Sequence, residues 1–161
     1  MGLDGAANDI DRLSTFAPTH GGADSITSGN GYDLIFGGTA GDTIHAGAGN
    51  DLVFGDHGKA EATATGAVIA RDLPLSGAID AFTFTSIDVL DIDLGGADTI
   101  HGEGGEDIII GGQGGDSIFA GNHDDDVIGG HTKLVFSSLV QTTPHIKSGK
   151  LRLLATAYAE K

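Results

Sequence analysis

Residues 21–58 read GGADSITSGNGYDLIFGGTAGDTIHAGAGNDLVFGDHG, and this stretch is built on a repeat of nine residues. Aspartate returns at positions 24, 33, 42 and 51, and an isoleucine or valine follows each aspartate two residues later. A second stretch, 95–132, shows the same pattern, with aspartate at 98, 107, 116 and 125. Because neither series slips, the sequence predicts two arrays of four structural repeats, separated by an insert.

The repeat unit, roughly G-G-x-G-x-D-x-(Ile/Val)-x, divides into a turn and a short strand. Glycine tolerates positive φ, so we expect the first six residues to turn tightly. The last three residues are then extended, with the central aliphatic side chain on one face and its neighbours on the other. Two units complete one coil, and the strands of successive coils stack about 4.8 Å apart. The sequence therefore predicts an all-β fold, a parallel β-roll whose isoleucines and valines line a thin interior.

In such a roll the aspartates form two columns along the edges, where like charges repel one another. Ca²⁺ relieves this repulsion because it binds about 6–8 oxygen atoms, from carboxylates and from the backbone carbonyls that glycine-rich turns expose. Mg²⁺ fits less well because it retains its waters, and the absence of cysteine excludes a thiolate zinc site. Since strands of three residues bury little surface, we expect the roll to fold only with the metal bound.

The composition excludes several other classes of protein. The 161 residues include 28 glycines and carry a net charge of −15 at pH 7. This acidic balance argues against a nucleic-acid binder, which needs a basic surface. No disulfide framework is possible without cysteine, and no apolar run approaches the length of about 18 residues that a membrane span needs. The G-x-S-x-G, HExxH and P-loop motifs of common enzyme classes are absent.

The nonapeptides resemble the RTX calcium-binding repeat, as in SGNGYDLIF (28–36), AGAGNDLVF (46–54) and GGQGGDSIF (111–119). GDHG (55–58), followed by the insert and by GGADTI (95–100), is similar to the repeating block of very large secreted RTX proteins. The resemblance implies that one aspartate of each repeat is a calcium ligand: Asp24, Asp33, Asp42, Asp51, Asp98, Asp107, Asp116 and Asp125. It also implies that turns 18 residues apart share an ion, which pairs Asp24 with Asp42, Asp33 with Asp51, Asp98 with Asp116 and Asp107 with Asp125.

Two turns depart from the repeat. Residues 37–42 read GGTAGD, with Ala40 where glycine is usual. Residues 120–125 read AGNHDD, with His123 at the same place. We expect these two turns to bind calcium more weakly than the others.

The residues beside the buried aliphatic side chains differ between the two faces of the predicted roll. One face is largely polar, with Ser25, Thr27, Thr43, His45, Thr99, His101, Ser117 and Phe119. The other face is apolar, provided that both arrays stack as one roll: Leu34, Phe36, Leu52, Phe54, Ile108, Ile110 and Ile128. Such a face is seldom left in water. The insert, the tail, a second copy of the chain or an acyl ligand would each cover it.

The remaining segments lose the nine-residue period. Residues 59–94 are rich in threonine, isoleucine, valine and phenylalanine, so we expect a β-rich insert whose strands extend or cover the roll. Asp88, Asp91 and Asp93 offer either another cation site or a solvated strand face. Residues 1–20 are expected to cap the open end of the roll. Residues 133–161 form a more basic tail, in which TTPHIKSGKLRLLATA (142–157) resembles a piece of tripartite tricarboxylate transporter solute-binding proteins.

These features predict a calcium-binding module that folds on binding calcium, a secreted structural or interaction protein. The RTX resemblance implies type I export, which agrees with the lack of a Sec signal pattern at residues 1–18. The alternative is a calcium-dependent hydrolase of small esters or lactones, in which calcium polarises a carbonyl and a histidine acts as base. Its candidate residues are His45, His57, His101 and His131, with the acyl chain on the apolar face. Whether the chain is an enzyme stays open, and the missing motifs favour the module.

Overall fold

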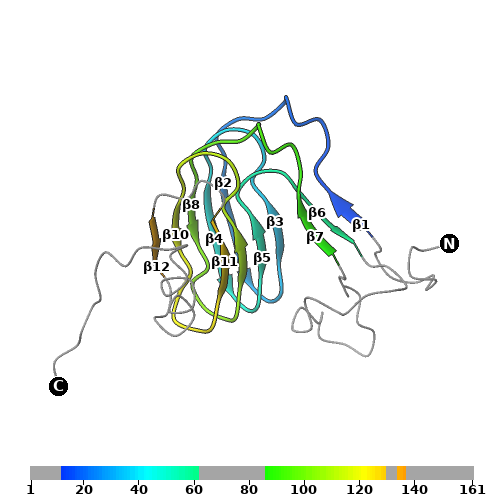
Figure 1. Ribbon diagram of the computed structural model, residues 1–161. Coiled ribbons are helices and arrows are strands. Elements are labelled where there is room, and N and C mark those ends of the chain that lie inside the picture. Colours follow the sequence, from blue (N-terminus) through cyan, green and yellow to red (C-terminus); the bar gives the residue numbers. More distant parts are fainter. Residues whose placement is uncertain (1–11, 62–85, 130–133, 137–161) are drawn as a thin grey trace, which may run out of the picture.

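The computed structural model describes residues 12–61, 86–129 and 134–136 (Figure 1). These residues form strands connected by turns, with no helix among them. Within that part of the chain, no helix could therefore cross a membrane. His131, the interior of the insert and the tail beyond residue 136, including 142–157, lie outside the described residues.

The roll consists of two parallel sheets between which the chain alternates, so the predicted parallel β-roll is confirmed (Figure 1). The five-stranded sheet has the order β12-β10-β8-β4-β2. Its strands are β2 (Ser25–Asn30), β4 (Thr43–Ala48), β8 (Thr99–His101), β10 (Ser117–Phe119) and β12 (Leu134–Phe136). The four-stranded sheet has the order β11-β9-β5-β3. Its strands are β3 (Leu34–Phe36), β5 (Leu52–Phe54), β9 (Ile108–Ile110) and β11 (Asp126–Ile128).

The two arrays stack as one continuous roll. Strand β4 of the first array pairs with β8 of the second, with Ile44 opposite Ile100. Strand β5 pairs in the same way with β9, with Val53 opposite Ile109. The insert therefore loops out of the roll without interrupting either sheet.

A single file of aliphatic side chains fills the interior between the two sheets. The exposed fractions of these side chains lie between 0% and 7% for Ile35, Ile44, Val53, Ile100, Ile109 and Ile118. Ala46 and Ala120 complete the buried cluster, and Ile26 and Val127 pack against its two ends. The strands β3, β5, β8, β9 and β10 thus each contribute one central side chain to the core, as the period of two along a strand requires.

The turns bring backbones so close together that glycine is required at some positions. Gly47 and Gly49 have φ values of 100° and 137°. A Cβ atom on Gly47 would lie 1.8 Å from the carbonyl oxygen of Gly29, and one on Gly49 would lie 1.5 Å from that of Gly31. Successive turns therefore stack backbone on backbone, which leaves their carbonyl and amide groups as the polar lining of the edges.

A third sheet covers the apolar face of the roll. It contains β1 (Arg12–Ser14), β6 (Gly58–Glu61) and β7 (Ser86–Val89), paired antiparallel in the order β1-β6-β7. We call it the covering sheet, and Figure 1 shows it beside β3 and β5. Its Leu13, Ala60 and Ile87 stand in one row and pack on the apolar side chains of the roll. Of the segment expected to cap the open end, residues 12–20 are described, and β1 within them belongs to this sheet.

The covering sheet decides between the covers that the sequence left open for the apolar face, and cover by the insert is confirmed for the part that β6 and β7 reach. Leu52, Phe54 and Ile110 are buried against it, so the apolar face is not open there to an acyl ligand or a second copy of the chain. The ends of the insert supply β6 and β7, and an N-terminal segment that the sequence did not suggest supplies β1. Ile128, at the far end of the same face, is 55% exposed.

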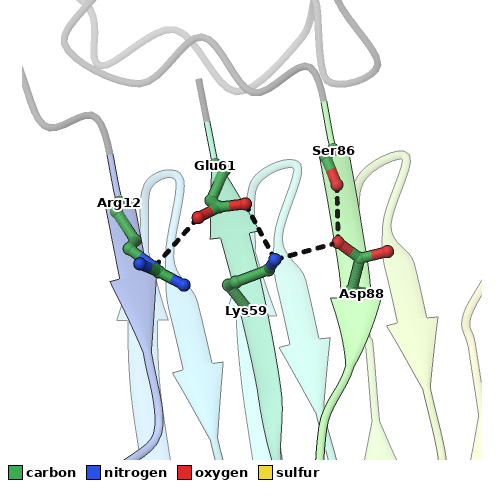
Figure 2. Close-up of polar contacts among 5 residues, drawn as sticks. All are labelled: Arg12, Lys59, Glu61, Ser86 and Asp88. Atoms are coloured by element: carbon green, nitrogen blue, oxygen red, sulfur yellow. Dashed lines mark hydrogen bonds and ion pairs between the residues drawn. The ribbon is translucent and has the colours of Figure 1, made fainter. Parts of the chain in front are cut away.

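The outer face of the covering sheet carries a strip of charged side chains (Figure 2). Glu61 lies 2.9 Å from Arg12 and 2.8 Å from Lys59, and the Asp88 carboxylate lies 3.4 Å from Lys59. The Ser86 hydroxyl donates to Asp88 at 2.6 Å and is the main cause of the lowered pKa of that carboxyl. Asp88 thus belongs to a solvated strand face, one of the two interpretations that the sequence left open for it.

Candidate metal centre

The repeat aspartates stand in two columns at opposite edges of the roll. The first column precedes the strands of the five-stranded sheet and contains Asp24, Asp42, Asp98 and Asp116. The second column precedes the strands of the four-stranded sheet and contains Asp33, Asp51, Asp107 and Asp125. In each column all aspartates except the N-terminal one are buried, with exposed fractions of 0–2%. The roll therefore places most of its repeat carboxylates out of contact with water.

Backbone amides link the aspartates of each column into a ladder. In each column, the amide of every aspartate except the C-terminal one donates to Oδ1 of the aspartate one coil further along. In the first column these distances are 2.8 Å from Asp24 to Asp42, 2.8 Å from Asp42 to Asp98 and 3.1 Å from Asp98 to Asp116. In the second they are 2.8 Å from Asp33 to Asp51, 2.9 Å from Asp51 to Asp107 and 3.1 Å from Asp107 to Asp125. One oxygen of each buried carboxylate is thereby satisfied.

In five of these carboxylates the second oxygen has no such partner. It is buried without a hydrogen bond in Asp42, Asp51, Asp98, Asp107 and Asp125. Burial raises the pKa of Asp51 to about 6, and that of Asp98 and Asp107 to about 7. Neighbouring carboxylates of the same column add to this rise. Buried, unpaired oxygens are costly, and a row of them is a set of donors that lacks its cation.

Backbone carbonyl oxygens converge on the same places as the unpaired carboxylate oxygens. A Cβ atom on Gly37 would lie 2.1 Å from the carbonyl oxygen of Gly55 and 2.6 Å from Asp42 Oδ2. One on Gly55 would lie 2.4 Å from the carbonyl oxygen of Gly111 and 2.3 Å from Asp98 Oδ2. The glycines keep these pairs of oxygens clear of side chains. An all-oxygen donor set of carboxylates and carbonyls suits Ca²⁺.

Side chains alone do not form a metal site in this structure. Among residues 12–61, 86–129 and 134–136, no group of three or more histidine, aspartate or glutamate side chains is arranged to hold a metal ion. A cation at either edge would therefore take carbonyl oxygens of the turns in addition to the carboxylates. This requirement agrees with the convergence of both kinds of oxygen beside Gly37 and Gly55.

A family model for the RTX calcium-binding nonapeptide repeat matches the chain in four copies, at residues 19–53, 36–59, 92–118 and 104–130. These segments belong to the RTX repeat family. They cover about half of the chain and contain every strand of the roll except β12, so the roll is an RTX calcium-binding β-roll. No curated protein and no solved structure matches the chain. The match does not extend to 142–157, so nothing supports the transporter resemblance of the tail.

The RTX columns contain contacts that the sequence-based pairing lacked. All four predicted pairs, 18 residues apart, are adjacent in the ladders. Two further pairs, Asp42 with Asp98 and Asp51 with Asp107, are adjacent across the insert although they lie 56 residues apart in sequence. Each column is therefore one uninterrupted ladder rather than two separate pairs.

The two atypical turns behave differently from each other. Ala40 adopts a positive φ of 83°, so it takes the conformation in which the repeat usually has glycine. His123 is not among the described residues with positive φ, and its Nδ1 accepts a hydrogen bond from the Gly105 amide at 3.3 Å. Ala40 thus keeps the positive φ of the repeat at the cost of strain, whereas His123 does not adopt that conformation.

Asp56 is a buried carboxylate that the sequence pattern did not single out. It is 2% exposed, and it accepts hydrogen bonds from the amides of Gly96 at 2.8 Å and Gln113 at 2.5 Å. Burial raises its pKa to about 6, opposed by these two bonds and reinforced by the charges of Asp116 and Asp42. It therefore lies beside the first column. Because Asp56 falls outside the nine-residue series, periodicity gives no signal for it.

The histidines of the hydrolase alternative do not form one site. His45 and His101 stack on the outer face of the five-stranded sheet, with ring centroids 4.6 Å apart, and His45 Nδ1 lies 2.8 Å from Glu103. His57 is buried near the first column, at the opposite end of these strands, where its Nε2 lies 2.9 Å from the Thr39 hydroxyl. His131 lies outside the described residues. No observation in the described part of the chain favours the hydrolase over the calcium-binding module.

Proposed function

We propose that this RTX β-roll is a module whose folding is driven by calcium, and that the eight repeat aspartates are its side-chain ligands. The observation that supports the proposal most directly is the set of buried carboxylate oxygens without a hydrogen bond, one on each of five column aspartates. An ordinary folded protein leaves few such groups unpaired. Cations on these oxygens would complete their coordination and neutralise the two columns.

The energetic case for a calcium requirement is a balance of small terms. Each unsatisfied buried polar group costs about 1–3 kcal/mol, and charged groups cost more. Burial of the central aliphatic side chains of the short roll strands offsets part of this cost. Binding at one site contributes about 1.4 kcal/mol when free calcium exceeds Kd about tenfold. Several sites of this kind would convert a roll that is unstable alone into a stable one.

Where the module folds depends on the calcium concentration of its surroundings. Calcium modules outside cells bind with Kd values of about 10⁻⁴–10⁻³ M. With such affinities the chain would stay unfolded inside the cell and fold after export. We therefore propose a secreted structural or interaction module. We propose that this module is organised as an N-terminal segment (1–20), a first array (21–58), an insert (59–94), a second array (95–132) and a tail (133–161).

Circular dichroism tests the proposal on the full chain. We expect chelator to abolish the β-sheet signal, and millimolar CaCl₂ to restore it along a sigmoidal titration. MgCl₂ at equal ionic strength is the control, and it is expected to restore little because Mg²⁺ retains its waters. A β-sheet spectrum that is the same in chelator and in calcium would refute calcium-driven folding.

A further inference from the structure

The insert leaves the roll from inside a turn. The Gly38 amide donates to the carbonyl oxygen of Gly55 at 3.0 Å, so residues 55–56 stack on the first half of the preceding turn, 37–42. A Cβ atom on Gly41 would lie 2.6 Å from the carbonyl oxygen of Ala97, so residues 95–98 stack on its second half. One turn of the first column is therefore built from two segments that are joined only through residues 57–94. We call it the split turn.

The side chain of Asp56 spans the break in the split turn. Its Oδ1 accepts from the Gly96 amide in the other half of the same turn, and its Oδ2 accepts from the Gln113 amide in the following turn. Gly95 and Gly112 make room for it, because a Cβ atom on either would lie 2.2–2.4 Å from Asp56 Oδ2. The Asp56 carboxylate thus connects its own segment to the segments that contain Gly96 and Gln113, which are distant from it in the sequence.

The neighbouring residue anchors the point at which the insert departs. His57 lies beside Thr39 of the preceding turn, and the Thr39 hydroxyl donates to the carbonyl oxygen of Pro18. The Leu90 amide donates to the carbonyl oxygen of His57 at 3.0 Å, which brings the outgoing and returning strands of the insert together. These bonds fix the base of the insert, but none of them joins residues 55–56 to residues 95–98. That connection depends on Asp56.

The split turn also contributes to the candidate calcium site of the first column. The carbonyl oxygen of Gly55 and Asp42 Oδ2 converge beside Gly37, and Asp98 Oδ2 points to Gly55. If residues 55–56 separated from residues 95–98, the carbonyl oxygen of Gly55 would move away from the carboxylates of Asp42 and Asp98. The geometry of the first column therefore depends on a closed split turn, whereas no break of this kind occurs in the second column, whose turn 46–51 is continuous.

We propose that Asp56 is a positioning residue, outside the nonapeptide pattern, that closes the split turn and so keeps the first calcium column continuous across the insert. The claim that Asp56 closes the split turn is argued from its two hydrogen bonds, and the claim that this closure affects calcium binding rests on the proposed function. Asp56 acts here through the backbone of the turn, and the two amides that it binds report directly on whether it does so.

Amide hydrogen exchange on the full chain in calcium tests the closure. In Asp56→Ala we expect the Gly96 and Gln113 amides to exchange at least about tenfold faster than in the parent chain, because each loses its acceptor. Asp124→Ala, which removes an exposed carboxylate, is the matched control and should leave both amides unchanged. Unchanged exchange at both amides in Asp56→Ala would overturn the proposal. If that variant does not fold, Asp56→Asn carries the test, because it keeps one acceptor oxygen and should expose one of the two amides selectively.

A calcium titration followed at the amides of Asp98 and Asp107 separates the two claims. In Asp56→Ala we expect the midpoint at Asp98, in the first column, to rise about tenfold, and that at Asp107, in the second, to stay within about twofold. Equal changes in both columns would show that Asp56 stabilises the whole roll and does not position one column. If the parent chain itself shows no calcium response, calcium-driven folding fails, while the exchange experiment still decides whether Asp56 closes the turn.

Discussion

Five of the buried repeat aspartates place their two carboxylate oxygens in different surroundings. Oδ1 accepts the amide of the preceding coil and so holds the register of the ladder, as in Asp107, whose Oδ1 lies 2.9 Å from the Asp51 amide. Oδ2 of the same residue is buried without a hydrogen bond. One side chain thus serves the fold through one atom and is available to a cation through the other.

Replacing one ladder carboxylate by its amide should separate these two roles. In Asp107→Asn the shape is kept and the buried charge is lost. Without calcium at pH 7.5 we expect the free energy of unfolding to rise by about 1–2 kcal/mol, because a carboxylate whose pKa is raised to about 7 by burial no longer has to be ionised there. In calcium we expect the opposite, a calcium midpoint about tenfold higher, because one charged ligand is lost.

Circular dichroism without calcium measures the first effect as a larger residual β-sheet signal in Asp107→Asn, and a calcium titration measures the second. Asp126→Asn makes the same change at an exposed neighbour of the second column and should alter neither quantity much. A variant that binds calcium as tightly as the parent chain would argue against Asp107 as a ligand.

Ala40 offers a second test at the level of a single residue. Its φ of 83° lies in the left-handed region, which costs an L-residue with a Cβ atom about 1–2 kcal/mol. We therefore expect Ala40→Gly to stabilise the roll by about 1 kcal/mol in saturating calcium, measured by urea unfolding. Ala97→Gly is the control, because Ala97 has no positive φ and glycine there only increases the freedom of the unfolded chain. Equal effects of the two substitutions would contradict the strain argument.

Among the elements, the covering sheet shows a strict division between its two faces. Leu13, Ala60 and Ile87 face the roll, and the alternate residues of the same strands form the charged strip of Figure 2. The cross-strand partners Arg12 with Glu61 and Lys59 with Asp88 carry opposite charges. The sheet is therefore amphipathic with a period of two, which fixes the face that it turns to the roll.

Phe54 tests the contribution of this interface. It is 1% exposed and stacks on Phe36 with ring centroids 4.7 Å apart. We expect Phe54→Ala to lower the free energy of unfolding by about 3–5 kcal/mol in saturating calcium, since truncation of a buried phenylalanine leaves a cavity. Phe119→Ala is the control on the five-stranded sheet, where Phe119 is 37% exposed and stacks on His101, and it should cost much less. Urea unfolding compares the two variants, and similar losses would mean that the covering sheet adds little.

Over the whole molecule, burial of the carboxylates makes the stability of the roll depend on pH. The pKa values of Asp98 and Asp107 are raised by burial from 3.8 to about 7. The folded roll therefore binds protons more tightly than the unfolded chain. Below pH 3.8 these carboxyls are protonated in both states and impose no penalty. Above about pH 7 they are ionised in both states, and the folded state then bears the full cost of burying charge.

It follows that the calcium-free roll should lose stability as the pH rises from about 4 to about 7. Calcium binding should strengthen over the same range, because protons and calcium compete for the same oxygens. The β-sheet circular dichroism signal in metal-free buffer at several pH values, together with calcium titrations at each pH, measures both trends. A metal-free β-sheet signal that grows as the pH rises from about 4 to about 7 would contradict the raised pKa values.

The nine-residue period was sufficient to predict the roll, its aliphatic interior and its two columns of aspartates. Ile44 and Asp42 could be placed because each takes its position from its own turn and strand, which are local in the chain. The covering sheet and the split turn could not be predicted in this way. Leu13 packs with Ala60 and Ile87, and Asp56 binds amides 40 and 57 residues away, so these contacts exist only once the chain has folded. A short repeat constrains only residues that are close together in the chain. The covering of the apolar face and the closure of the split turn depend on contacts between distant segments, and such contacts produce no periodic pattern in the sequence.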